Sequence, residues 1–270
     1  MTTLKAENLH KSFGRRPVVK GVDIHCSSGE IIGLLGRNGA GKTTCFQMIV
    51  GLLKPDLGRI LLDDRDITAT STHIKARLGI TYLPQENSVF LKASVKNNLD
   101  LILELQPGSR RERDEKIASL LNELGMTEHA DQSAHSLSGG ERRRLEISRS
   151  LALNPSFLLL DEPFTGIDPL TTRELQKILL SLKEKGIGII LSDHNVRDTF
   201  RITDRAYIID DGEILIEGKP RHIIADIRAR ERFLGKNFKQ GKAVQLSLFG
   251  ETTDPPELIP ERSKTEKNTQ

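Results

Sequence analysis

The chain has 270 residues, of which 37% are hydrophobic, so it can bury one substantial core or two lobes that share one. Its 40 Lys and Arg residues nearly balance its 37 Asp and Glu residues, and the net charge of +3 gives no indication of a nucleic-acid partner. The longest apolar runs are far shorter than the roughly 18 residues of a membrane span, and residues 1–11 lack the apolar region of a secretory signal, so we expect neither.

The first 85 residues contain short apolar runs separated by turn signals, a pattern typical of strands. The runs lie at residues 18–19, 22–26, 31–35 and 60–62. A helix-like stretch follows the third run and begins at Thr43.

A complete phosphate-binding loop lies between the run at residues 31–35 and this helix. Its three glycines let successive N–H groups point at an anion, and the helix adds its positive N-terminal end. We expect Lys42 to bridge the β- and γ-phosphates, the Thr43 hydroxyl to hold Mg²⁺ and Thr44 to lie near the α-phosphate. The sequence therefore predicts a nucleoside triphosphate held by Gly36, Arg37, Asn38, Gly39, Ala40, Gly41, Lys42, Thr43 and Thr44.

Residues 86–153 have a helical pattern and predict a helical insert. One helix is indicated by apolar residues at i, i+3, i+4 and i+7 before a glycine stop, namely Ile117, Leu120, Leu121 and Leu124.

A second helix of the insert begins in the segment Leu-Ser-Gly-Gly-Glu, residues 137–141. Ser138 is a candidate N-cap, and Gly139 and Gly140 offer two unobstructed backbone N–H groups next to the positive helix end. This arrangement suits a phosphate group. An ordinary capped surface helix would explain Ser138 but not the paired glycines.

A buried strand is predicted at residues 157–160, and it ends in Asp161 and Glu162. Both carboxylates then lie at the edge of the sheet where the phosphate loop opens. We expect Asp161 to hold Mg²⁺, through water, and Glu162 to polarise the water that attacks the γ-phosphate. By itself, an Asp-Glu pair after a strand is often a solvated turn.

The pattern after residue 173 predicts a helix over residues 173–185, a buried parallel strand over 187–191 and a strand over 206–210. Asp211 and Gly212 then form a two-residue hairpin signal before a strand at residues 214–216, which makes the sheet mixed at that edge. Residues 239–270 are polar and proline-rich and predict a mobile tail.

The chain resembles the ATP-binding subunits of ABC transporters. The phosphate loop, Gln85, the Leu-Ser-Gly-Gly-Glu segment, the Asp161–Glu162 strand end and His194 occur in the order of that family, over residues 4 to about 238. The resemblance implies an α/β fold of the P-loop NTPase type. It has a mixed, mostly parallel core sheet, an antiparallel β subdomain and the helical insert, within one ATP-binding domain of residues 1–238.

The resemblance also implies a homodimer that hydrolyses ATP with Mg²⁺. In the family, the Leu-Ser-Gly-Gly-Glu segment of one copy closes on the γ-phosphate of ATP bound by the other copy. Ser138, Gly139 and Gly140 are then nucleotide-binding residues supplied across a dimer interface.

Further roles come from the same resemblance. Gln85 senses Mg²⁺ and the attacking water, Asp168 lies at the dimer seam, His194 contacts the γ-phosphate and Phe13 stacks on the base. Each has a plainer alternative: a polar loop residue for Gln85, a helix or turn cap for Asp168, a structural histidine for His194 and simple packing for Phe13.

Within the family, the segments at residues 82–86, 137–147, 161–169, 192–197 and 233–235 look like those of subunits that power lipopolysaccharide export. This likeness implies two integral membrane partners that dock near Phe90, at the cytoplasmic face of the inner membrane. Burial of Phe90 in the helical insert is the alternative. Cys26 and Cys45 lack a metal or redox spacing, which also favours a reducing cytoplasm.

Other functions stay open at this point. The chain could serve another transporter, such as a branched-chain amino acid importer, or be a soluble ABC ATPase that acts on DNA or ribosomes. The segment from Gln245 to Phe249 resembles a peptide that docks on the bacterial replication sliding clamp, although a match of this length arises easily by chance.

Overall fold

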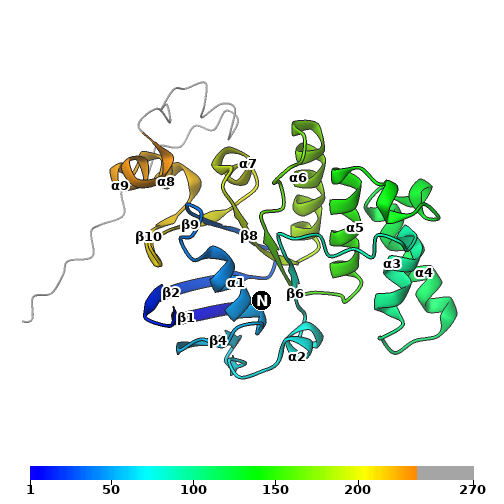
Figure 1. Ribbon diagram of the computed structural model, residues 1–270, viewed down its shortest axis with the longest axis horizontal. Coiled ribbons are helices and arrows are strands. Elements are labelled where there is room, and N and C mark those ends of the chain that lie inside the picture. Colours follow the sequence, from blue (N-terminus) through cyan, green and yellow to red (C-terminus); the bar gives the residue numbers. More distant parts are fainter. Residues whose placement is uncertain (236–270) are drawn as a thin grey trace, which may run out of the picture.

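The computed structural model describes residues 1–235, which form two β-sheets and a set of helices (Figure 1). The predicted tail at residues 239–270 and the segment from Gln245 to Phe249 lie outside the described residues. Among the helices of residues 1–235, none combines the length and the hydropathy that a bilayer crossing requires.

The larger sheet has the order β10-β9-β3-β8-β7-β6. All pairs are parallel except β9 with β10, which confirms the predicted hairpin and the mixed edge. Its strands are β3 (Ile31–Leu35), β6 (Ile80–Leu83), β7 (Phe157–Asp161), β8 (Gly188–Asp193), β9 (Arg205–Asp210) and β10 (Glu213–Gly218).

The smaller sheet is antiparallel and has the order β2-β1-β4-β5. It consists of β1 (Thr3–Phe13), β2 (Arg16–Ser27), β4 (Leu57–Leu62) and β5 (Arg65–Asp66). The runs at residues 18–19 and 22–26 were predicted as separate strands, and this prediction is wrong. They form one long strand because the pairing with β1 continues on both sides of Gly21, which has no partner in β1 and lies at a register shift.

Two helices pack near this sheet, α1 (Lys42–Val50) after the phosphate loop and α2 (Thr72–Arg77) before β6. Helix α1 begins one residue before the predicted start at Thr43. Its Cys45, Phe46 and Met48 are completely buried between the two sheets, in a cluster that both sheets share.

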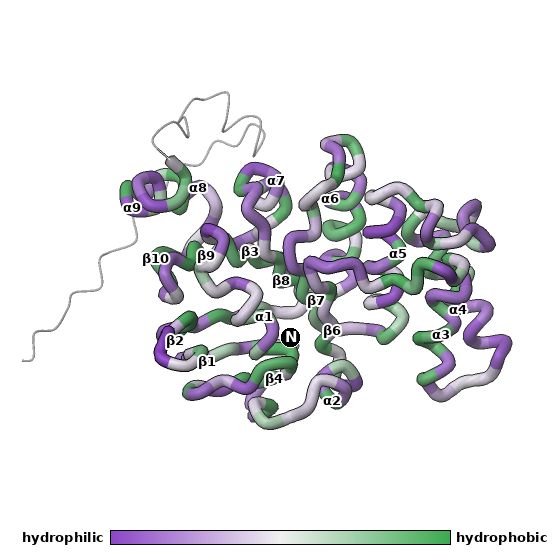
Figure 2. Tube along the Cα trace, in the orientation of Figure 1, coloured by the Kyte–Doolittle hydropathy of each residue, from purple (hydrophilic) through white to green (hydrophobic). Residues whose placement is uncertain are grey.

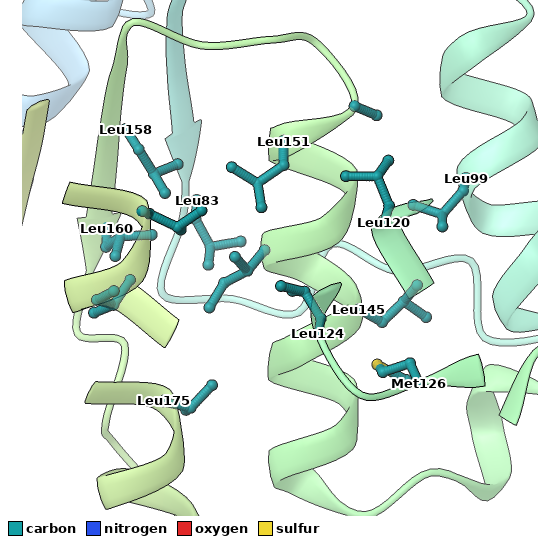
Figure 3. Packing of buried hydrophobic residues seen from close by; sticks show 14 of the residues in the cluster. Leu83, Leu99, Leu120, Leu124, Met126, Leu145, Leu151, Leu158, Leu160 and Leu175 are labelled. Atoms are coloured by element: carbon teal, nitrogen blue, oxygen red, sulfur yellow. The ribbon is translucent and has the colours of Figure 1, made fainter. Parts of the chain in front are cut away.

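Residues 86–153 contain α3 (Val95–Leu103), α4 (Arg110–Glu123), α5 (Gly139–Leu151) and the short 3₁₀ turns Thr127–His129 and Ala134–Ser136, as the helical-insert prediction states. Ser94 caps α3 and Ser109 caps α4, the latter with a full capping box. Figure 3 shows how this lobe joins the sheet. Leu99, Leu120 and Leu145 from the helices and Leu83 and Leu158 from the strands belong to one buried cluster.

The C-terminal half supplies the remaining helices. Helix α6 begins at Pro169, earlier than the predicted residue 173, because Asp168 caps it and proline fits the first helical turn. In Figure 2 the hydrophobic residues of β3 and β8 contrast with the largely hydrophilic α4. These helices are α6 (Pro169–Glu184), α7 (Val196–Phe200), α8 (Pro220–Ala225), α9 (Ile227–Ala229) and the π-helical turn η3 (Arg230–Leu234).

Lys75 of α2 is fully buried against the far end of α1. Its ammonium donates hydrogen bonds to the carbonyl oxygens of Ile49 at 2.8 Å and Met48 at 3.4 Å. A cation at this end complements the negative pole of the phosphate-loop helix. Burial lowers the pKa of the Lys75 side chain from 10.5 to about 8.

This burial predicts a pH-dependent stability. The unfolded chain binds the Lys75 proton more tightly than the folded protein does, so the wild-type protein gains stability as pH rises from about 8 to about 10. Relative to a Lys75→Met variant, its free energy of unfolding should increase by about 2 kcal/mol over this window. Urea denaturation across the range measures this difference. Exposed Lys54→Met is the control, and a difference for Lys75→Met that stays constant with pH would contradict the prediction.

Candidate active site

The phosphate loop joins the end of β3 to the start of α1. Helix α1 has no side-chain cap at its N-terminal residue Gly41, so the N–H groups of its first turn are available to an anion. Gly36 packs on β9, where a Cβ would lie 2.4 Å from the carbonyl oxygen of Ile209, so no side chain fits there. The loop lines a cleft of about 250 Å³, bounded by Val18, Asn38, Gly39, Gly41, Lys42, Thr43, Thr44, Gln85 and Glu162.

Lys42 has its ammonium folded onto its own loop. It donates to the carbonyl oxygens of Gly36 at 2.9 Å and Arg37 at 3.2 Å. Burial lowers the pKa of Lys42, and the nearby carboxylates of Glu162 and Asp161 oppose that shift. The ammonium therefore lies between a loop that can accept phosphates and the acidic end of β7.

Asp161 is completely buried at the end of β7. One carboxylate oxygen accepts a hydrogen bond from the Ser192 hydroxyl and the other accepts one from the Tyr82 hydroxyl at 3.2 Å. Tyr82 and Ser192 were not among the predicted site residues. Both are fixed by pairing of β6 and β8 with β7, a long-range arrangement that leaves no local sequence signal.

The other predicted catalytic residues, Gln85 and His194, lie next to the Glu162 carboxylate. Its carboxylate accepts hydrogen bonds from the Gln85 amide at 3.0 Å and the Thr165 hydroxyl at 3.1 Å. Nδ1 of His194 lies 3.7 Å from the same carboxylate oxygen. Gln85, Glu162 and His194, which follow three different strands, thus meet at one point.

Gln85, Glu162 and His194 also line a second cleft, of about 520 Å³. Phe233 of η3 reaches it from the C-terminal end of the described chain, and the sequence analysis did not assign this residue to the site. The lining residues are Gly36, Arg37, Asn38, Gln85, Glu162, Thr165, His194 and Phe233.

The Leu-Ser-Gly-Gly-Glu segment lies elsewhere. Within residues 1–235, neither cleft is lined by Ser138, Gly139 or Gly140. Ser138 is the N-cap of α5, as predicted, and it forms a capping box with Glu141, whose carboxylate accepts from both the Ser138 N–H and hydroxyl at 2.8 Å. These bonds lower the pKa of Glu141, and His129 lies 3.4 Å from the other carboxylate oxygen.

Gly140 has a packing role that the sequence did not reveal. A Cβ on it would lie 2.2 Å from Cγ2 of Thr171, at the place where α5 meets α6. The Thr171 hydroxyl is held by the Asp168 carboxylate at 2.5 Å, which fixes the rotamer. Gly139 is less restricted, because its nearest neighbour would be 3.8 Å away.

Three other predicted residues lie outside both clefts in the described chain. Asp168 accepts hydrogen bonds from the N–H groups of Leu170 and Thr171 and so caps α6, which is the alternative role that the sequence analysis gave for it. Phe13 is half exposed at the end of β1. Phe90 is also half exposed, and the Arg149 guanidinium lies 4.9 Å from its ring centre.

Comparisons with known proteins agree with this geometry. A sequence model of the family described as "ABC transporter" matches residues 19–165. The chain is 50% identical to the lipopolysaccharide export system ATP-binding protein LptB of Acidithiobacillus ferridurans, over 87% of this chain and 98% of that protein. It is 45% identical to LptB of Escherichia coli K12, over 88% of this chain and all of that protein.

The chain belongs to the ABC transporter ATP-binding family. Among solved structures, it is similar to the ADP conformation of MJ1267, an ATP-binding cassette of an ABC transporter, with a TM-score of 0.79 and 29% identity over 87% of this chain and 100% of that chain. It is also similar to the dimeric post-hydrolysis state of the cassette MJ0796 bound to ADP and Pi, with a TM-score of 0.72 and 25% identity over 81% and 99% of the two chains. The chain is therefore an ABC-type ATPase, and the predicted fold is confirmed.

The residues at the cleft suit Mg²⁺ bound with a triphosphate. Mg²⁺ is usually held by one or two protein oxygens together with waters and phosphate oxygens. The Thr43 hydroxyl and the Gln85 amide border the cleft, whereas Asp161 is buried and is not among the residues that line it. Within the described residues there is no cluster of three or more His, Cys, Asp or Glu that would bind a metal without the nucleotide.

The paired glycines of the Leu-Ser-Gly-Gly-Glu segment provide a test of packing. Gly140→Ala should destabilise the protein by about 1–3 kcal/mol because its Cβ collides with Thr171, whereas Gly139→Ala should change stability by less than about 1 kcal/mol. Thr171→Ser removes the colliding methyl group and keeps the hydroxyl, so it should restore most of the loss. Chemical denaturation of the three variants measures these effects, and equal losses for both alanine variants would contradict the packing argument.

Proposed function

We propose that this chain is the ATP-hydrolysing subunit of a lipopolysaccharide export transporter and acts as a homodimer. The main support for a dimer is that, within one copy, the Leu-Ser-Gly-Gly-Glu segment does not line the phosphate-loop clefts. The dimeric state of the related cassette MJ0796 supports it. The lipopolysaccharide assignment rests on the likeness to LptB along nearly its whole length.

In this proposal residues 1–238 form the ATP-binding domain. The loop amides, Lys42 and Thr43 bind the triphosphate, and Ser138, Gly139 and Gly140 of a second copy complete the γ-phosphate site. Thr43, Gln85 and Asp161 would hold Mg²⁺, which would neutralise phosphate charge. Asp168 lies at the seam between the copies and Phe13 contacts the base.

Glu162 acts as the general base, with His194 and Gln85 beside it. A base must lie within hydrogen-bond reach of the proton that it takes, directly or through one water. The contacts of the Glu162 carboxylate with Gln85 and His194 support this role, because they fix its direction at the mouth of both clefts. Dimer closure on ATP and reopening after hydrolysis then drive the membrane partners.

The membrane partners are two integral subunits that dock near Phe90, with this chain on the cytoplasmic face of the inner membrane. The half-exposed Phe90 ring supports a docking role. The Ser88 N–H just before it donates to Glu146 on α5, so the segment is anchored to the helix that carries Ser138.

The base assignment predicts a trapped state. Glu162→Gln should retain ATP binding but lower kcat by about 100-fold or more, since it removes the group that accepts the water proton. With ATP and Mg²⁺ it should accumulate as a closed dimer in size-exclusion chromatography with light scattering. Lys42→Ala is the control, because it should neither bind ATP nor dimerise. Wild-type turnover by Glu162→Gln would refute the assignment.

A mixing experiment tests the shared site. Lys42→Ala and Ser138→Arg should each be inactive alone, but a mixed dimer holds one site with an intact Lys42 and an intact Ser138. An equal mixture should therefore recover up to about a quarter of wild-type ATPase activity, as expected for a two-fold symmetric dimer. A mixture that stays inactive, although both variants fold and the mixed dimer forms, would contradict a site shared between copies.

The transport role is tested by replacement of LptB in Escherichia coli cells depleted of that protein. The chain should restore growth and co-purify with the lipopolysaccharide export membrane subunits. Phe90→Ala should abolish both while soluble ATPase activity remains, because an exposed docking ring takes no part in hydrolysis. Co-purification with amino acid importer subunits instead would favour the alternative transporter.

A further inference from the structure

Arg143 of α5 is a buried arginine that lines neither cleft, with only 7% of its surface exposed. A guanidinium has five N–H donors, and each of them has an acceptor here. The acceptors are the carbonyl oxygens of Pro84, Asp161, Glu162 and Pro163, at 3.0 to 3.3 Å, and the Glu146 carboxylate at 2.8 Å.

Three of these acceptors are consecutive carbonyls of the segment that carries the proposed base. Nη2 donates to Asp161 and Glu162, and Nε donates to Pro163. The backbone of Glu162 has φ +47°, a left-handed conformation that is costly for a residue with a Cβ. From the other side, the Glu162 N–H donates to the Ser192 carbonyl oxygen at 3.0 Å. The unusual turn is thus held between β8 and one arginine of α5.

The direction of the Glu162 carboxylate follows from this backbone turn. A displacement of about 1 Å in a reacting group can cost about 100-fold in rate. We propose that Arg143 is a positioning residue that holds the left-handed turn of Glu162. The direction of the Glu162 carboxylate then depends on α5, the helix that begins after Ser138. This inference rests on the proposed function, because it takes Glu162 as the general base.

Glu146 completes the arrangement from the next turn of α5. One of its carboxylate oxygens binds the Arg143 guanidinium and the other accepts the Ser88 N–H at 2.8 Å. Its side chain is almost fully buried, so the two charges neutralise each other away from water. A shift of α5 is therefore transmitted to the turn at Glu162 and to the Gln85 segment, where Arg143 also binds Pro84.

The deciding variant is Arg143→Lys, which keeps the charge but has three donors on a single point and cannot hold three carbonyls in a plane. We expect kcat to fall about 10- to 100-fold while KM for ATP changes by less than about twofold, because phosphate contacts are untouched. Arg205→Lys is the matched control. Arg205 also has several partners, namely Glu30, Tyr207 and Glu217, but it lies at the start of β9, away from both clefts.

A merely structural role for Arg143 would give a different result. If Arg143→Lys lowers kcat no more than Arg205→Lys does, the proposal is wrong. ATP-driven dimerisation of the double variant Arg143→Lys/Glu162→Gln should match that of Glu162→Gln alone. The residual hydrolysis of the double variant should also equal that of Glu162→Gln, because Arg143 acts only through Glu162. A further fall of about tenfold would show an independent role and overturn the proposal.

Two further measurements distinguish a failure of the Arg143 proposal from misfolding of the variant and from a failure of the proposed function. If Arg143→Lys does not fold, Glu146→Gln decides, because it keeps an oxygen for Ser88 but removes the charge that orients Arg143. It must then lower kcat at least about threefold with KM unchanged, or the proposal fails. The proposed function fails independently if Glu162→Gln turns over ATP at the wild-type rate, whatever Arg143 does.

Discussion

The structure depends on the parallel pairing of β8 between β3 and β7. This register places Leu35 opposite Asp193 and Asp161 opposite Ser192, so all three strands end at one edge of the sheet. The phosphate loop begins one residue after β3 and His194 follows β8 directly, while the acidic pair begins at Asp161, the last residue of β7. The strands are buried throughout, and their apolar runs allow helices to cover both faces. The location of the site is a consequence of this pairing.

The edge is also where buried charge is concentrated. Asp161 and Asp193 are fully shielded from solvent, and burial raises the pKa of Asp193 despite the N–H groups of Asn195 and Phe164 that bind its carboxylate. Lys42 is the cation that faces these carboxylates across the cleft. In the proposed function a triphosphate adds further negative charge here, which Lys42 and a divalent cation would offset.

The sequence was sufficient to predict features that depend on neighbours along the chain. The phosphate loop, the capped start at Ser138 and the hairpin at Asp211 have local spacing rules. The fold was predicted from the resemblance of the motif order to the ABC-transporter family. The structural roles that it missed depend on partners distant in the sequence. Arg143 binds carbonyl groups, which every residue has, and Gly140 is required by a methyl group on another helix. Such contacts have no sequence pattern because they depend on how α5 packs in three dimensions.

The Ser138 capping box affects how a dimer site can work. In the single copy, the Ser138 hydroxyl already donates to Glu141, and the Glu141 N–H donates back at 3.3 Å. In the proposed dimer, a γ-phosphate must therefore replace an existing hydrogen bond. An exchange of this kind is worth only about 1 kcal/mol, because the donor already has a partner. In the proposed dimer, the Ser138 contact across the seam is then weak, so closure would depend on several contacts made at once.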